Sequence, residues 1–213
     1  LPRDLRGDAL GVTPDSDARR VPAREGRGEV REKASRFFGF AARAASPEAA
    51  EQFLDRLRRE HHDATHVAFA WKIGAGDRAP ARSSDAGEPS GTAGKPILGA
   101  LESAELTDAV AAVVRYYGGT KLGTGGLARA YRLAAERAVE AAGFETVYET
   151  VTLAVRCPYE KTGLVRRLLD PPHVRLGSER FDPEPVLTIE VRRSRLERVR
   201  AALEEARVEF RIC

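Results

Sequence analysis

Five glycines fall within the nine residues 118–126, where a strongly apolar run gives way to a helical pattern. The first turn of a helix has unpaired N–H groups and the positive end of the helix dipole, so a junction of this kind binds anions well. Residues 109–135 contain four Lys and Arg side chains and no Asp or Glu. We therefore expect a phosphate or a nucleic-acid backbone to bind here. The expected binding residues are Gly118, Gly119, Gly123, Gly125 and Gly126, with Arg115, Lys121 and Arg129 as charge partners.

The glycines have two other possible roles, a nucleotide-binding loop and a simple tight turn, and the spacing of the residues bears on the first of them. A nucleotide-binding phosphate loop requires the pattern G-x-x-x-x-G-K-[ST]. The one Gly-Lys pair, Gly94-Lys95, has Pro89 at the first glycine position and Pro96 after the lysine, and no clean G-x-G-x-x-G opens a βαβ unit. The glycines could also serve only a tight turn where a helix packs against a sheet, and this structural alternative stays open.

The loop sequence SSDAGEPSGTAG at residues 83–94 places two carboxylates near hydroxyl groups. Asp85 or Glu88 could act as a general base or as a cation ligand, with Ser90 and Thr92 holding a phosphate. The alternative is that Asp, Ser and Thr side chains cap turns in a solvated loop. A nucleophilic role for Ser90 requires an activating base within reach, and no feature of the sequence supplies one.

Three histidines in the segment 61–66 raise the question of a metal site. His62 and His66 have i, i+4 spacing, but the residues between them are typical of a turn rather than a helix. No H-E-x-x-H motif and no cysteine set completes such a site. We therefore expect no metal and no cofactor. His66 remains a candidate for catalysis or for phosphate contact, because a strand is expected to start there, beside the loops.

The composition is that of an ordinary soluble globular protein. The chain has 213 residues, of which 42% are hydrophobic and 31% charged, with a formal net charge of +3. That charge is too small to indicate nucleic-acid binding by itself. No apolar run approaches the roughly 18 residues of a membrane span. The two cysteines, Cys157 and Cys213, form no C-x-x-C pattern. These features predict a cytoplasmic protein with no membrane segment.

Local patterns outline an N-terminal domain over residues 28–145, preceded by an extension at 1–27 with no visible chemistry. Ser46 and Pro47 are typical of a helix start, and Gly143 is typical of a helix end. A long loop fills residues 74–94. The expected strands are 29–33, 35–43, 67–73 and 107–117. The expected helices are 47–60, 95–104 and 124–142.

The remainder, residues 146–213, predicts a second domain with the order βαββαβ, the ferredoxin-like arrangement. Ser194 and Glu197 predict a capping box at the start of its second helix. The first and last strands pair antiparallel in this topology, which places Cys157 and Cys213 near opposite ends of the sheet, so we expect no disulfide between them. The expected strands are 153–157, 173–181, 186–192 and 208–213, with a turn at Asp182-Pro183 and a first helix at 158–169.

Two long motifs resemble the YigZ/IMPACT family: DAGEPSGTAGKPIL at 85–98 and RYYGGTKLGTGGLARAY at 115–131. KASRF at 33–37 and ATH at 64–66 match the family's upstream elements. The resemblance covers about residues 28–145. The tail resembles, more weakly, the small C-terminal domain of bacterial members, which is similar to a late domain of elongation factor G.

The resemblance implies an α/β N-terminal domain of the ribosomal protein S5 domain-2 type, and thus an α/β (α+β) two-domain protein. It also implies a link to translation. The eukaryotic relatives regulate a translational stress kinase, but the partner-binding domain that they use is absent here. The family brings no firmly established catalytic activity. The residues that it implies along one cleft are Lys33, Ser35, His66, Asp85, Glu88, Ser90, Thr92, Arg115, Lys121 and Arg129.

Three hypotheses follow. In the first, the protein binds RNA or a ribosome-associated surface, with phosphates on the glycine junction and a base stacked on Tyr116, Tyr117 or Tyr131, at least one of which we expect to be buried. In the second, it is an enzyme acting on a phosphorylated small molecule or nucleotide, which requires the 83–94 loop to lie near residues 118–126. In the third, residues 146–213 dock a protein partner.

Overall fold

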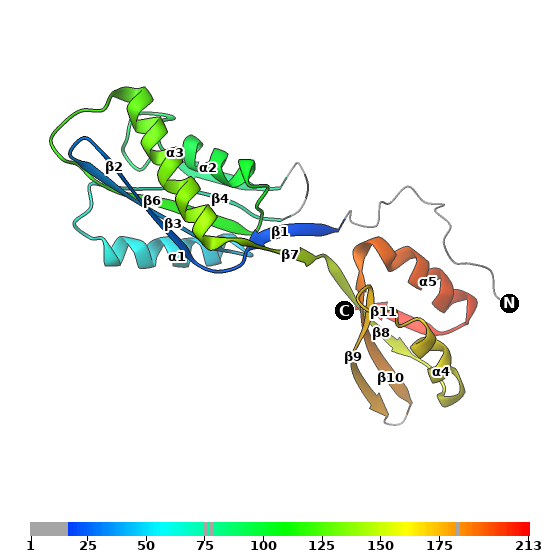
Figure 1. Ribbon diagram of the computed structural model, residues 1–213. Helices are drawn as coiled ribbons and strands as arrows, with labels where there is room; N and C mark the ends of the chain where they lie inside the picture. Colours follow the sequence, from blue (N-terminus) through cyan, green and yellow to red (C-terminus); the bar gives the residue numbers. More distant parts are fainter. Residues whose placement is uncertain (1–16, 75, 77–78, 182–183) are drawn as a thin grey trace. The chain divides into compact units, whose positions relative to one another are not determined.

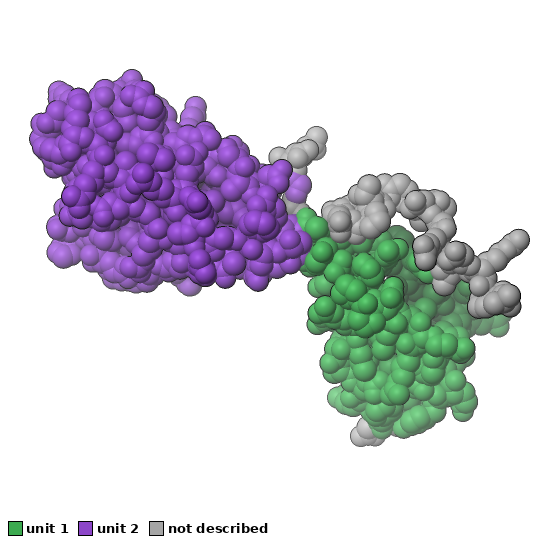
Figure 2. All heavy atoms as spheres, in the orientation of Figure 1, with its two compact units in different colours: residues 1–18, 148–213 green, residues 19–147 purple. Residues whose placement is uncertain are grey.

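The computed structural model describes residues 17–213 apart from 75, 77, 78, 182 and 183. The chain forms two compact units, coloured purple and green in Figure 2. We call residues 19–147 the N-terminal unit, and residues 148–213 with residues 17 and 18 the C-terminal unit. The mixed α/β two-domain fold expected from the sequence is confirmed. Residues 19–27 of the expected extension lie in the N-terminal unit, whereas residues 1–16 lie outside the described residues.

A five-stranded antiparallel sheet forms the middle of the N-terminal unit. Neighbouring strands pair in the order β2-β3-β6-β4-β5. The strands are β2 (Gly26–Glu32), β3 (Ser35–Arg43), β4 (His66–Lys72), β5 (Ala81–Ser84) and β6 (Ala109–Tyr116). Helices α2 (Gly94–Ser103) and α3 (Gly123–Ala142) cover one face, and α1 (Pro47–Glu60) covers the other, as Figure 1 shows. The unit therefore has three layers.

The central strand β6 explains why the sequence shows an unbroken apolar run there. Ala111 and Val113 lie in the hydrophobic cluster under α2 and α3, whereas Ala112 and Val114 lie in the cluster under α1. A strand that is covered on both faces has no polar side to show. On one face, α3 approaches β3 so closely that a Cβ at Gly39 would overlap the Ala134 carbonyl oxygen. Glycine at that position lets the helix backbone rest directly on the strand.

Helix boundaries in this unit follow the local signals. The Ser46 hydroxyl oxygen accepts a hydrogen bond from the Ala49 N–H (3.2 Å), and Pro47 occupies the first helical position of α1. Gly143, with φ of 60°, ends α3. None of the described helices is both long and apolar enough to cross a membrane.

Three strands were not expected from the sequence. Strand β5 lies inside the predicted 74–94 loop, of which residues 75, 77 and 78 are outside the described range. Strands β1 (Ala18–Pro22) and β7 (Phe144–Tyr148) form a separate two-stranded sheet. All three are short and polar or mixed in sequence, so their structure depends on a partner strand rather than on local pattern.

The C-terminal unit has the βαββαβ order, with strands paired as β11-β8-β10-β9. Strand β8 pairs antiparallel with both β10 and β11. Cys157 is buried and Cys213 is exposed, and both are free thiols at opposite ends of the β8–β11 pair. The predicted turn at residues 182–183 lies outside the described residues. The elements are β8 (Thr150–Arg156), α4 (Tyr159–Arg167), β9 (Val174–Phe181), β10 (Pro185–Arg192), α5 (Leu196–Glu205) and β11 (Glu209–Ile212).

The capping box predicted at Ser194 and Glu197 is wrong. Ser194 lies in a short 3-10 turn, η1 (Arg193–Arg195), and α5 starts only at Leu196 without a side-chain cap. The Ser194 hydroxyl and its N–H both donate to Asp17 Oδ2, at 2.8 and 3.1 Å. A charged acceptor from a distant part of the chain therefore replaces the local helix cap.

Candidate functional site

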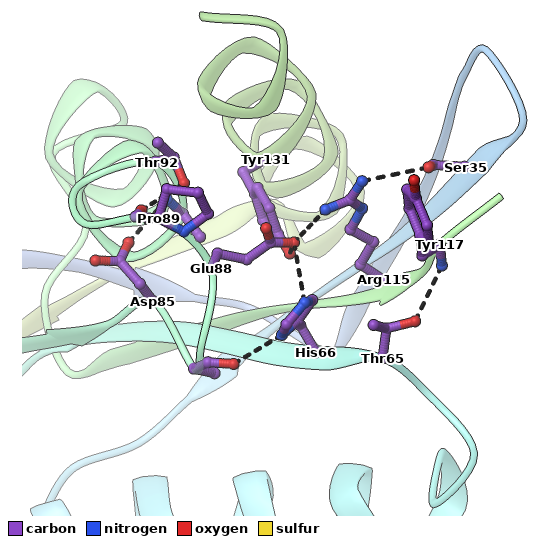
Figure 3. Close-up of polar contacts among 12 residues, drawn as sticks. Ser35, Thr65, His66, Asp85, Glu88, Pro89, Thr92, Arg115, Tyr117 and Tyr131 are labelled. Atoms are coloured by element: carbon purple, nitrogen blue, oxygen red, sulfur yellow. Dashed lines mark hydrogen bonds and ion pairs between the residues drawn. The ribbon is translucent and has the colours of Figure 1, made fainter. Parts of the chain in front are cut away.

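At the edge of the N-terminal sheet where strand β6 ends, three neighbouring strands place residues of the candidate site side by side. Arg115, near the end of β6, lies opposite Phe37 of β3 on one side and His66 of β4 on the other. Phe37 belongs to the cluster covered by α2 and α3. The loop between β5 and α2 closes over this edge, and α3 passes above it (Figure 3). The antiparallel register therefore gathers residues that are far apart in the sequence.

A buried ion pair lies at the centre of this edge. Arg115 Nη1 donates to Glu88 Oε1 at 2.5 Å, and the two side chains are only 6% and 3% exposed (Figure 3). The Tyr131 hydroxyl of α3 donates to the same oxygen at 2.7 Å. Burial, and then this bond to Glu88, raise the pKa of Tyr131 far above its usual value, so the phenol stays a donor. The three side chains fasten the loop, the sheet and α3 together.

The guanidinium of Arg115 lies near two aromatic rings. Its central carbon lies 5.3 Å from the Phe37 ring centroid and 5.2 Å from that of Tyr117. Its Nη2 donates to the Ser35 hydroxyl oxygen at 3.4 Å, and the same oxygen accepts the Gly118 N–H at 3.3 Å. Arg115 was expected to face a phosphate, but it points inward and its charge is matched by Glu88. It supports the glycine junction through Ser35.

His66 borders the ion pair from β4. Its Nδ1 lies 2.9 Å from the Ala86 carbonyl oxygen, which can only accept, so Nδ1 carries the hydrogen. Its Nε2 lies 3.7 Å from Glu88 Oε1, which is close enough for an ion pair with an imidazole that carries both protons. His66 thus contacts the Glu88 carboxylate but is too far from it for a hydrogen bond.

Asp85 acts as the cap of α2. Its Oδ1 accepts the N–H groups of Ala93 (2.9 Å) and Gly94 (2.8 Å), and its Oδ2 accepts that of Gly91 (2.8 Å). Burial raises the pKa of the Asp85 carboxyl, but these three backbone donors and the charge of Lys95 outweigh it, so the pKa lies below its usual value. Both carboxylate oxygens are occupied, and the first amides of α2 already hold an anion.

The two hydroxyl residues of the loop have different places. Thr92 is buried, and its hydroxyl donates to the Pro89 carbonyl oxygen at 2.6 Å, so it holds the turn in shape (Figure 3). Ser90 is exposed. Neither lies among the contacts of the Glu88–Arg115 pair. The structure therefore brings Ser35, His66, Glu88 and Arg115 together and leaves Asp85 and Thr92 to organise the start of α2.

The start of α3 is open. The helix has no side-chain cap at Leu122 and no acid in its first turn. Residues 118–121 and 123–125 are exposed. Gly119 and Gly123 have φ of 84° and 71°, a left-handed conformation that favours glycine. The first turn of α3 is therefore exposed, and no carboxylate of the described residues accepts its N–H groups.

Three cationic residues surround this open turn. The Lys33 ammonium, from the turn between β2 and β3, donates to the Lys121 carbonyl oxygen at 3.2 Å. Lys121 lies in the loop directly before α3. The guanidinium of Arg129 lies over Gly125, where a Cβ would come within 3.5 Å of Nη1. Lys33 thus contacts the backbone of the loop before α3, Lys121 belongs to that loop, and the Arg129 guanidinium lies beside the first turn of the helix.

Several residues of the site were not identified from the sequence. Tyr131 was one of three tyrosines of which at least one was expected to be buried; it is fully buried, and its bond to Glu88 was not predicted. Tyr117 is 44% exposed and covers the Arg115 guanidinium. Thr65 accepts the Tyr117 N–H at its hydroxyl oxygen (3.0 Å). The sequence signal for Tyr131 was its position on the apolar side of α3, where a hydroxyl group requires a polar partner.

A pocket of about 480 Å³ lies on the other side of β4. Three histidines and an arginine line it, with Thr65 and Ser84 supplying hydroxyl groups; the histidines are His61, His62 and His66, and the arginine is Arg58. Because α1 ends at Glu60, His62 and His66 do not share a helix. Within the described residues, no group of three or more His, Cys, Asp or Glu side chains is arranged to hold a metal ion.

Comparison with known proteins gives a consistent result. The family model described as the Impact N-terminal domain matches residues 33–139. An IMPACT family member of Haemophilus influenzae is 35% identical over 174 residues, covering 81% of this chain and 84% of that protein. An IMPACT family member of Thermus thermophilus is 43% identical over 152 residues, covering 71% and 80%. A crystal structure described as that of a hypothetical protein is 29% identical, with a TM-score of 0.67, and covers 91% of this chain and 96% of that chain.

Proposed function

Since the chain belongs to the IMPACT family, we propose that it is a cytoplasmic RNA-binding protein that holds phosphate groups on the open N-terminal turn of α3. The proposal includes the link to translation that the family resemblance implies, with RNA or a ribosome-associated surface as the partner. The ligand is defined by its chemistry: a chain of phosphate groups that meets backbone N–H groups and cationic side chains.

The observation that carries the proposal is that the first turn of α3 is exposed and has no side-chain cap. The first residues of the helix, 123–125, are exposed, no side chain among the described residues caps them, and residues 109–135 contain no Asp or Glu. A helix start of this kind attracts phosphate through its N–H groups and its dipole. Lys33, Lys121 and Arg129 add positive charge at the same place. Phosphate contacts of this type supply most of the sequence-independent affinity for nucleic acid.

The buried pair below the junction supports this turn. Arg115 binds Glu88 and Ser35, and Ser35 accepts the Gly118 N–H. A Cβ at Gly118 would overlap the Ala34 carbonyl oxygen, so the junction rests directly on the β2–β3 turn. In this proposal, Arg115 positions the phosphate-binding loop without touching the phosphate.

The enzymatic alternative places Asp85 or Glu88 as a base beside the same loop. The 83–94 loop and the glycine junction do lie near each other, because Glu88, Arg115, Ser35 and Gly118 form a continuous chain of contacts. However, both oxygens of Asp85 accept backbone N–H groups, and the charge of Glu88 is matched by Arg115. The lowered pKa of Asp85 makes that carboxylate a weak proton acceptor, and the Oε1 of Glu88 already accepts hydrogen bonds from Arg115 and Tyr131. We therefore favour binding over catalysis.

The experiment compares the parent protein with the double variant Lys121→Ala plus Arg129→Ala. Binding of a fluorescent 20-nucleotide RNA is measured by anisotropy over a series of KCl concentrations. Removing two phosphate contacts to single-stranded RNA is expected to lower the slope of log K against log [salt] by about 1.4 and the affinity by roughly tenfold.

The matched control is Arg59→Ala plus Lys72→Ala, which removes the same charge from α1 and from the far end of β4. This control is expected to retain the parent affinity and the parent salt slope. If the Lys121 and Arg129 double variant also retains both, the proposed site is wrong.

A further inference from the structure

The sheet of the C-terminal unit has one covered face and one open face. Side chains of β8 and β10 that point to the covered face, such as Leu153 and Ile189, lie in one hydrophobic cluster with Val165 of α4 and Leu203 of α5. Both helices therefore pack on the same face of the sheet. The alternate residues of each strand point the other way, and no helix of the described residues packs over them.

The register of the strands shows which residues share the open face. Val186 of β10 lies between Arg180 of β9 and Arg156 of β8. Glu190 lies opposite Arg175, and Arg211 of β11 lies opposite Ala154. The described residues of this face are Thr150, Thr152, Ala154, Arg156, Arg175, Ser178, Arg180, Val186, Thr188, Glu190, Arg192, Glu209 and Arg211.

This face is basic. Four of its arginines are exposed, namely Arg156, Arg175, Arg180 and Arg211, against the two acids Glu190 and Glu209. The fifth arginine, Arg192, is buried, with its guanidinium carbon 3.3 Å from the Tyr148 ring centroid. The residues between the arginines are short: Thr, Ser, Ala and Val. Glu179 points to the other face and pairs with Arg166 of α4 (2.8 Å), so it does not neutralise this set.

We propose that the open face of the C-terminal sheet is a second contact surface for the RNA phosphate backbone. This inference rests on the proposed RNA-binding function. It gives the C-terminal unit a role in RNA binding as well. Strands lie about 4.8 Å apart, so arginines two strands apart are separated by about 10 Å. They are spread across the sheet as separate charges for an extended polyanion, rather than gathered around one ion.

The residue types of this face suit an RNA backbone better than a protein partner. Protein interfaces are rich in aromatic side chains at their centre and poor in charge, whereas the described residues of this face include no aromatic residue and four exposed arginines. The exposed apolar side chains of this unit, such as Leu176 and Phe181, belong to the helix-bearing side by register. The listed strand residues of the face offer no aromatic ring, and the Tyr148 ring beside them is already packed against Arg192, so bases have no ring to stack on and the face contacts RNA with no sequence preference.

The test uses the full chain and the same 20-nucleotide RNA, with the four exposed arginines of the open face changed to Gln. Loss of four phosphate contacts is expected to lower the salt slope by about 2.8 and the affinity by more than tenfold, equally for RNAs of different sequence. The same four positions changed to Lys retain their charge and are expected to bind like the parent protein. Circular dichroism establishes that each variant is folded.

A matched control removes four arginines from the helices and helix ends of this unit: Arg167, Arg195, Arg198 and Arg207, each changed to Gln. It is expected to bind RNA like the parent protein. If the open-face variant binds like the parent while the Lys121 and Arg129 variant fails, the inference is overturned and the proposed function stands. If the open-face variant alone fails, the inference stands and the site at α3 is wrong. If the parent binds an acidic protein but no RNA, both are overturned.

Discussion

Two helices of the N-terminal unit start after glycine-rich loops, and their starts are used in opposite ways. At α2, the N–H groups of Gly91, Ala93 and Gly94 are already bound by the Asp85 carboxylate. At α3, no side chain caps the first turn, and its residues are exposed. The same local chemistry thus stabilises the fold in one place and stays open to solvent in the other.

Glycines at a helix start therefore do not by themselves make an anion site. What matters is whether the chain supplies its own carboxylate. Asp85 does so for α2, and residues 109–135 contain no acid that could do so for α3. Both starts depend on one buried pair, because Glu88 lies in the loop before α2 and its partner Arg115 binds the Ser35 hydroxyl that holds Gly118.

The largest expected effect comes from breaking this shared support with Glu88→Gln. The change leaves the guanidinium of Arg115 buried without a counter-charge, which costs about 3 kcal/mol of unfolding free energy. Urea denaturation followed by the fluorescence of Trp71 measures it, since Trp71 is the single tryptophan and is buried in this unit.

The control for this variant is Glu29→Gln. Glu29 pairs with Arg31 and Arg36 at the surface, so its loss is expected to cost much less than the loss of Glu88, because solvent screens exposed ion pairs. Equal losses for the two variants would show that the buried pair is no stronger a support than a surface pair.

A smaller effect is expected from opening the α2 start with Asp85→Ala. Loss of the cap costs about 1–2 kcal/mol at pH 7. The freed N–H groups are then available to sulfate, so sodium sulfate is expected to stabilise the variant more than it stabilises the parent, measured against sodium chloride of equal ionic strength. Asp55→Ala, which removes an exposed acid of α1, is the control and is expected to show no extra response.

The same variant has an expected dependence on pH. The folded-state pKa of Asp85 is lowered, so its contribution is complete above the usual aspartate pKa of about 3.9 and is lost as the pH falls through the folded value. The stability difference between parent and Asp85→Ala should therefore shrink below about pH 4. An unchanged difference down to pH 2 would show that the charge of Asp85 does not support the α2 start.

The smallest effect on stability is expected from closing the α3 start with Thr124→Asp. Thr124 is exposed in the first turn, and a carboxylate there stabilises the helix by about 0.5 kcal/mol. The same charge repels phosphate, and RNA affinity is expected to fall by about fivefold, the factor for about 1 kcal/mol. Thr124→Asn, of the same shape without the charge, should bind like the parent. Undiminished RNA binding by Thr124→Asp would contradict the contrast between the two helix starts.

Elements with strong local signals could be predicted from the sequence. The spacing of Phe53, Leu54 and Leu57 and the start at Ser46 define α1, because periodicity and capping act within a few residues. The βαββαβ order of the C-terminal unit follows from similar patterns. Strand β5 was missed because ARSS has little strand character of its own and forms by pairing with β4. Ser194 was misinterpreted because its acceptor, Asp17, is distant in the sequence.

The chemistry of the α3 junction could be predicted from the residues alone: its glycines, its cationic residues and its lack of acids. Which charges remain at the surface depends on how the chain packs. Arg115 lies 27 residues from Glu88 in the sequence, and Tyr131 lies 43 residues from it, yet all three meet at one carboxylate oxygen. Desolvation of a charge depends on what packs around it, and no local pattern records that. Lys33, Lys121 and Arg129 therefore became the cations of the proposed site, and Arg115 became its support.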